Sequence, residues 1–110
     1  AYWDKQAGGV RGKQDIPLAI DPPVDRVFFD HRAAAIIHDG DRDLRIDKTG
    51  SDSTVVWNPG PEGARSLSDM PDDDWPGMLC VETANALDNR YSLGDGKTHT
   101  LTSEIRVTTR

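Results

Sequence analysis

Residues 77–86 read Gly-Met-Leu-Cys-Val-Glu-Thr-Ala-Asn-Ala, an apolar run that contains a single carboxylate, Glu82. Successive side chains of a strand point to opposite sides, which divides this run into two alternating sets. Met78, Cys80 and Glu82 would lie on one side, and Leu79, Val81 and Thr83 on the other. Because both sets are largely apolar, the run predicts a β-strand against a core, with Glu82 at the edge of that core.

A carboxylate at the edge of a core must be paired with a positive charge, be hydrogen-bonded or have a raised pKa. A raised pKa suits a general base that works near neutral pH, so Glu82 is a candidate catalytic residue. The alternative is a glutamate near the end of a strand that is held in a structural salt bridge. The spacing of residues within the run, taken alone, favours the structural salt bridge.

Length and composition favour one small domain, residues 1–110, that is rich in turns. The chain has 110 residues, of which 35% are hydrophobic, with 10 glycines and 7 prolines. Short strands joined by loops fit this composition better than helices do. The net charge of −6, without a cluster of Lys or Arg, argues against nucleic acid or an anionic membrane as a partner.

The chain has one cysteine, Cys80, so the sequence predicts neither an intramolecular disulfide nor a cysteine metal site. Its place in an apolar run indicates an inert core thiol. No run approaches the roughly 20 apolar residues of a membrane span, and the first residues lack the pattern of a signal peptide. We therefore expect a cytoplasmic protein.

The order of apolar runs and turn residues predicts an all-β fold, an antiparallel β-sandwich. We expect an edge strand at 16–20, because Pro17 cannot donate to a ladder, and a hairpin at 33–48 with its turn at 38–43. We also expect one or two helical turns within 62–70, and a closing strand at 98–109 with one buried and one exposed side. The remaining strands are expected at 2–3, 24–29, 54–57 and 77–83.

Three aspartates at alternate positions, Asp39, Asp41 and Asp43, invite comparison with a calcium-binding loop. Leu44 occupies the sixth position, where such a loop requires glycine, and Gly50 the twelfth, where it requires glutamate. The stretch therefore indicates a polar hairpin turn. His31 and His38 are not spaced as a helical metal pair, so no metal site is predicted.

Several of these stretches, in this order, resemble the C-terminal part of the hexose-6-phosphate mutarotases, which are enzymes of aldose 1-epimerase type. The resemblance rests on 24–28, on Val55-Val56-Trp57-Asn58-Pro59, on 77–86 and on the closing residues from Leu93-Gly94 to His99-Thr100-Leu101-Thr102. It implies the β-supersandwich of galactose mutarotase and an isomerase that interconverts the anomers of a hexose or hexose phosphate. It implies no organic cofactor.

The resemblance also implies roles for two residues. Glu82 matches the glutamate that removes the proton of the anomeric hydroxyl, and Asp25 matches an aspartate that contacts sugar hydroxyls. Ring opening also needs an acid, for which this family uses a histidine. The family's histidines and its phosphate-binding arginines lie in an N-terminal half without a counterpart here, and His31, His38 and His99 fall outside its histidine motifs.

We therefore expect either a chain completed by a missing N-terminal half or a small relative that covers its sheet edges as a homo-oligomer. Two functions follow as hypotheses. The first is an aldose 1-epimerase-type isomerase whose acid lies outside this chain. The second is a non-catalytic carbohydrate-binding or self-associating β-sandwich, in which tryptophans supply a stacking surface for sugar. The candidates for that surface are Trp3, Trp57 and Trp75.

Overall fold

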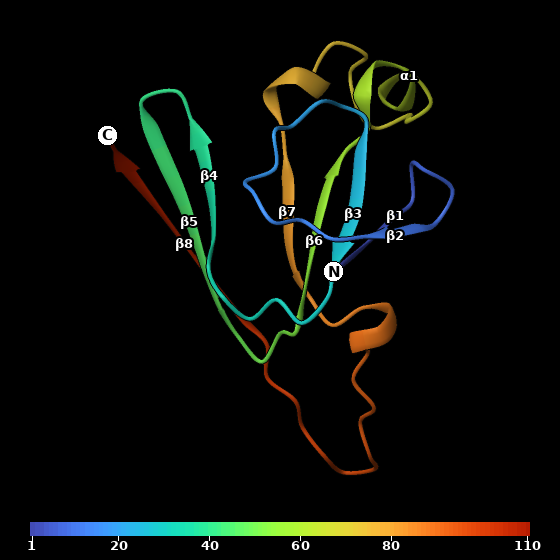
Figure 1. Ribbon diagram of the computed structural model, residues 1–110, viewed down its shortest axis with the longest axis vertical. Helices are drawn as coiled ribbons and strands as arrows, with labels where there is room; N and C mark the ends of the chain where they lie inside the picture. Colours follow the sequence, from blue (N-terminus) through green and yellow to red (C-terminus); the bar gives the residue numbers. More distant parts are fainter.

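Eight strands, one short α-helix and two 3-10 turns make up the computed structural model, which describes residues 1–110 (Figure 1). The strands are β1 Tyr2–Asp4, β2 Val10–Gly12, β3 Val24–Phe28, β4 Ala35–Asp39, β5 Arg42–Thr49, β6 Ser53–Asn58, β7 Cys80–Ala84 and β8 Thr102–Thr109. The helix is α1 Gly60–Arg65, and the 3-10 turns are η1 Trp75–Gly77 and η2 Leu87–Asn89. No helix has the length and apolarity to cross a membrane.

The strands form two antiparallel sheets, which confirms the predicted all-β, sandwich-like fold. The larger sheet has the order β2-β1-β3-β6-β7, and the smaller sheet has the order β4-β5-β8. Figure 1 shows the smaller sheet leaning away from the larger one, so that the two meet at one end and diverge toward the other. The strands β7 and β8 are therefore both edge strands.

The core is small, because only 11 of the 110 residues are buried. Its apolar members are Val24, Val27, Phe29, Ile46 and Ala64. A cavity of about 670 Å³ lies between the sheets. Its lining includes Phe28, Thr54, Val56 and Val81 from the larger sheet and Ala35, Ile36, Ile37 and His38 from the smaller sheet.

The predicted hairpin and the strand after it are both confirmed, but the turn predicted at 38–43 is shorter, because its outer residues pair within the two strands. β4 and β5 pair along their length, with His38 opposite Asp43 and Asp39 opposite Arg42, which leaves a tight turn at Gly40 and Asp41. Strand β6 ends before Pro59, as the predicted stop requires. The strands expected at 2–3 and 24–29 are observed as β1 and β3.

The strand predicted at 16–20 is wrong. These residues form no ladder, because Pro17, Pro22 and Pro23 supply no N–H groups to a neighbouring strand. Instead, residues 17–20 lie along the cavity between the sheets. The apolar alternation in this segment therefore reflects cavity lining and not strand pairing.

Two predicted boundaries are shifted, the start of the helix and the start of β7, and contacts of Asn58 explain both shifts. Its Oδ1 accepts from the backbone N–H of Gly60 at 2.9 Å, which starts the helix at 60 and not at 62. Its Nδ2 donates to the carbonyls of Trp75 and Met78, both at 2.8 Å. With the Met78 carbonyl engaged in this way, β7 begins at Cys80, after the turn η1.

The closing strand exists, but the buried side expected for it is wrong. β8 begins at Thr102, and all eight of its residues are exposed. The apolar positions alternate as predicted, yet the smaller sheet diverges from the larger one, so no second layer covers them. Ile105 is 64% exposed and Val107 is 58% exposed.

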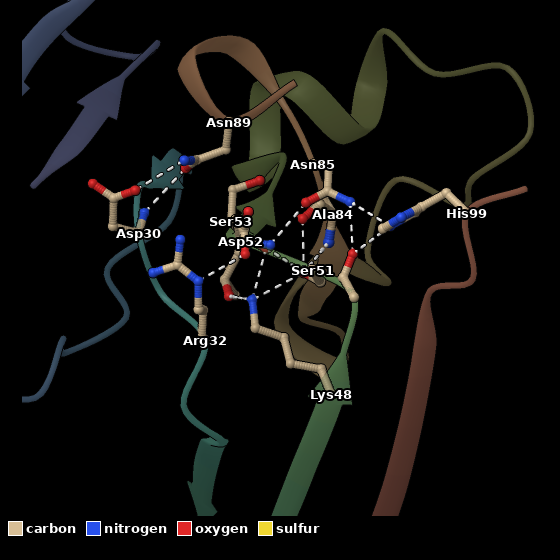
Figure 2. Close-up of polar contacts among 12 residues, drawn as sticks. Asp30, Arg32, Lys48, Ser51, Asp52, Ser53, Ala84, Asn85, Asn89 and His99 are labelled. Atoms are coloured by element: carbon tan, nitrogen blue, oxygen red, sulfur yellow. Dashed lines mark hydrogen bonds and ion pairs between the residues drawn. The ribbon is translucent and has the colours of Figure 1, made fainter. Parts of the chain in front are cut away.

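The two sheets are joined at their common end by a network of buried and half-buried polar groups, shown in Figure 2. We call it the polar junction: Lys48, Ser51, Ser53, Ala84 and Asn85. Lys48 Nζ donates to Ser51 Oγ at 3.0 Å and to the Ser53 carbonyl at 2.8 Å. Asn85 Oδ1 accepts from the Asp52 N–H, and its Nδ2 donates to the Gly50 carbonyl, both at 2.8 Å. The junction thus fixes the end of β7 to the connection between β5 and β6.

Candidate functional site

The hydrogen-bond ladders put the two candidate carboxylates on one side of the larger sheet. Residues directly opposite each other in antiparallel strands point to the same side. Trp57 lies opposite both Asp25 of β3 and Cys80 of β7, and Val55 lies opposite both Val27 and Glu82. Alternation then places all six side chains together. We call this side the carboxylate face: Asp25, Val27, Val55, Trp57, Cys80 and Glu82.

The carboxylate face points away from the smaller sheet. The other side of the larger sheet carries Phe28, Val56 and Val81, which line the cavity between the sheets. Thr83, the neighbour of Glu82, reaches Ser103 of β8 with 3.1 Å between the two hydroxyl oxygens. The two carboxylates therefore lie on the opposite side of the larger sheet from the cavity.

Asp25 and Glu82 are separated by two strand spacings, with β6 between them, and by two residues along the strand direction. A strand spacing of about 4.8 Å and a rise of about 3.4 Å per residue put their Cα atoms about 12 Å apart. Val55 and Trp57 of the intervening strand β6 fill the space between them. Both side chains can therefore reach toward one small ligand that lies over β6.

The expectation that Glu82 lies at the edge of a core is wrong. Glu82 is exposed, whereas Asp25 is half-buried, because the carboxylate face has no second layer over β7. The structure also gives Glu82 no ion-pair partner among its salt bridges, so the structural salt bridge considered from sequence is not formed. The proposed roles of both carboxylates stay predictions.

Cys80 lies beside Glu82 on the carboxylate face, and the charge of Glu82 affects the pKa of the Cys80 thiol. The thiol is free and half-buried, more open than the core position predicted for it. Burial raises the pKa of the Cys80 thiol, and the nearby Glu82 carboxylate raises it further. A thiol of raised pKa is a poor nucleophile at neutral pH, which agrees with the predicted inert character.

Two of the three tryptophans and one arginine also belong to this side of the sheet. Trp57 lies between Asp25 and Cys80, and Trp3 of β1 lies opposite Val27. Arg11 of β2 lies opposite Trp3, and its Nη1 makes an ion pair with Asp88 at 2.8 Å. Sequence reasoning missed Arg11, because it stands in a glycine-rich stretch without periodicity, and only the pairing of β2 with β1 reveals its side.

None of the three histidines belongs to β3, β6 or β7, the strands that carry the two carboxylates. His31 Nδ1 is 2.8 Å from Thr54 Oγ1, beside the cavity between the sheets. His38 Nδ1 is 2.9 Å from Asp43 Oδ1 at the hairpin, and His99 Nε2 donates to the Gly50 carbonyl at 2.7 Å. Each histidine therefore has a local partner away from the carboxylate face. No three His, Cys, Asp or Glu side chains gather closely enough to hold a metal ion.

Comparison with known proteins identifies a family that matches most of the chain and relatives that match a large part of it. The sequence profile of the family described as aldose 1-epimerase matches residues 6–106. A protein of Salmonella typhimurium with the provisional name glucose-6-phosphate 1-epimerase is 41% identical over 64 residues, which are 56% of this chain and 22% of that protein. No solved structure matches the chain.

Two further relatives carry the same provisional name. The Escherichia coli protein is 34% identical over 88 residues, which are 78% of this chain and 30% of that protein. The Cenchrus ciliaris protein is 30% identical over 87 residues, which are 77% of this chain and 26% of that protein. The chain thus corresponds to less than a third of the length of each relative.

Proposed function

The chain belongs to the aldose 1-epimerase family, and from that premise we propose that its carboxylate face contributes the base side of a hexose 6-phosphate epimerase site. The observation that carries the proposal is the shared side of Asp25 and Glu82, set by the pairing of β3 with β6 and of β6 with β7. The provisional names of the relatives supply the phosphorylated hexose as the substrate class.

In the proposed reaction, the Glu82 carboxylate takes the proton of the anomeric hydroxyl while the bond between C1 and the ring oxygen breaks. A general acid protonates the ring oxygen, which gives the open-chain aldehyde. Rotation about the C1–C2 bond and the reverse proton transfers close the ring on the other face of the carbonyl. Asp25 accepts hydrogen bonds from ring hydroxyls and holds the sugar over β6.

The acid in this scheme lies outside the chain. His31, His38 and His99 each bond to a group distant from the carboxylate face. Removal of one member of an acid and base pair commonly costs about 10²–10⁴ in rate. We therefore expect the isolated chain to bind hexose 6-phosphate more readily than it turns it over.

A second candidate function is a non-catalytic carbohydrate-binding module. It is favoured by the position of Trp57, which lies on the carboxylate face between the two carboxylates. An aromatic ring beside hydrogen-bond acceptors is a common way to hold a sugar. This module would use Asp25 and Trp57 for binding, and Glu82 would accept a hydroxyl hydrogen bond without moving a proton.

NMR exchange between the two anomers of glucose 6-phosphate distinguishes these functions. The catalytic proposal expects exchange above the spontaneous rate, and Glu82→Gln should lower it by about 10²-fold or more. Glu62→Gln, in the exposed first turn of α1, is the matched control and should change nothing. Exchange at the spontaneous rate with the unaltered chain would reject catalysis by this chain alone.

Titration of glucose 6-phosphate, followed by ligand-observed NMR, tests the binding module. Asp25→Asn and Trp57→Ala should each weaken binding, whereas Trp75→Ala, outside the carboxylate face, should not. Absence of binding to the unaltered chain would reject both functions. A cytoplasmic location, expected from the sequence, accompanies either proposal.

A further inference from the structure

Strand β8 presents an uncovered edge and uncovered side chains. It lies at the end of the smaller sheet, where β5 is its only neighbour. All eight residues are exposed, including two large apolar ones, Ile105 at 64% and Val107 at 58%. An open edge of this kind offers a row of free backbone donors and acceptors to another strand.

The charges on β8 are matched poorly by its neighbour within the chain. Arg106 lies directly opposite Arg45, and Glu104 lies directly opposite Asp47. Like charges directly opposite each other in a sheet are destabilising. Each charge is instead satisfied along its own strand: Arg106 Nε is 2.7 Å from Glu104 Oε1, and Arg45 Nε is 3.0 Å from Asp47 Oδ2. Asp47 of β5 lies diagonally across from Arg106 and helps to raise its pKa. Neither Arg106 nor Glu104, however, has an opposite charge directly across the ladder.

We propose that a second copy of this chain supplies it, by pairing its own β8 antiparallel to the first across a two-fold axis at Ile105. Ile105 then lies opposite its own symmetry mate. Glu104 lies opposite the second copy's Arg106, and Arg106 lies opposite the second copy's Glu104. The result is an isologous dimer with one continuous sheet in the order β4-β5-β8-β8-β5-β4.

The alternation of charges selects this register over its neighbours. An axis at Glu104 or at Arg106 would bring each of those charges opposite itself. An axis between residues would set a charge opposite Ile105 and mix polar with apolar side chains on one side of the sheet. Only the axis at Ile105 satisfies both charges and keeps Ile105, Ser103 and Val107 on the same side.

Charge-swap variants test the register in solution. We expect sedimentation velocity of the unaltered chain to show a dimer that dissociates on dilution. Glu104→Arg and Arg106→Glu should each weaken the dimer roughly tenfold or more, because like charges then meet across the axis. The double swap should restore dimerisation to within a few-fold, because opposite charges meet again.

The same charge-swap variants should change dimerisation without unfolding the chain, so the two effects can be measured separately. Glu104→Arg places a guanidinium opposite Asp47, and Arg106→Glu places a carboxylate opposite Arg45, so neither swap adds a like-charge pair within the ladder. Urea unfolding should therefore show stable folded chains. A swap of the exposed pair Lys13 and Asp15 is the matched control and should leave dimerisation unchanged.

Disulfide trapping locates the axis. In a Cys80→Ser background, Ile105→Cys should form a cross-linked dimer, because directly opposite residues bring their Cα atoms within the range of a disulfide. Thr102→Cys, also exposed on β8, should not, because it would lie far from its symmetry mate. A monomer at every concentration, a double swap no better than the single ones, or equal trapping at both positions would overturn the proposal.

Discussion

Ser51 holds both backbone groups of Ala84, the last residue of β7, through a single hydroxyl. Its Oγ lies 2.7 Å from the Ala84 carbonyl oxygen and 3.0 Å from the Ala84 nitrogen. Ser51 is 3% exposed, whereas Ala84 is half-buried. The hydroxyl has one proton, so it donates to one carbonyl while it accepts from the Ala84 N–H and from Lys48 Nζ.

Ser51→Ala should lower the free energy of unfolding by about 1–3 kcal/mol, because it removes the shared partner of the half-buried Ala84 N–H and carbonyl. Urea denaturation measures the loss. Ser66→Ala is the matched control, since Ser66 Oγ bonds only the Gly63 carbonyl at an exposed position. Equal losses in the two variants would show that the polar junction does not hold β7.

His31 should make stability depend on pH. Burial lowers its pKa from the ordinary value of 6.5, and the nearby Lys48 ammonium lowers it further. Below pH 6.5 the unfolded chain therefore binds more protons at this position than the folded chain does, so stability rises with pH across this window. Stability should fall as the pH drops from 6.5 toward the lowered folded pKa.

Unfolding midpoints in urea, measured from about pH 5 to about pH 8, test this dependence. His31→Gln should remove much of the slope, because the amide carries no titrating proton and can still bond Thr54. His38→Gln, at the exposed end of the hairpin, should keep it. A slope that survives His31→Gln unchanged would assign the dependence to another group.

Alanine substitutions at three glycines distinguish the stability cost of a left-handed backbone from the cost of steric crowding. Gly60 has a φ of +69°, and a Cβ there would lie 3.0 Å from the nitrogen of Pro23. Gly40 has a φ of +61° with open space around it, and Gly77 has neither constraint. Alanine in the left-handed region costs about 1–3 kcal/mol. The loss of stability in thermal or urea unfolding should therefore be largest for Gly60→Ala, smaller for Gly40→Ala and near zero for Gly77→Ala.

The shared side of Cys80 and Glu82 can be tested through thiol chemistry. Because the Glu82 carboxylate contributes to the raised pKa of the Cys80 thiol, Glu82→Gln should lower that pKa and speed the reaction with a disulfide reagent at neutral pH. Glu62→Gln should leave the rate unchanged. An unchanged rate in Glu82→Gln would place the two side chains on opposite sides of β7.

Local signals in the sequence were sufficient for the hairpin β4–β5 and for β6, because alternation and turn residues specify both. They failed where tertiary contacts decide. The apolar positions of β8 alternate regularly, but alternation does not say whether a second layer covers them. The residues at 16–20 alternate as well, and their prolines leave them as lining of the cavity. The start of β7 depends on Asn58, which is distant in sequence.

For the same reason, only part of the candidate site could be predicted from the sequence. Asp25 and Glu82 were named from a resemblance, and their shared side depends on two strand registers that no local pattern encodes. The exposure of Glu82 depends on what lies over β7, and Arg11 joins the same side only through the pairing of β2 with β1. The number and type of strands can be read locally, whereas register and coverage cannot.

The ladder through β3, β6 and β7 also sets rules for insertions and deletions. A single residue added within β6 between Val55 and Trp57 would reverse the side of every later residue in that strand, and either Asp25 or Glu82 would lose its place beside β6. The segment between α1 and β7 contains no strand, so added residues there would leave both registers intact. Length variation in this lineage should therefore accumulate around residues 66–74 and be excluded from β6.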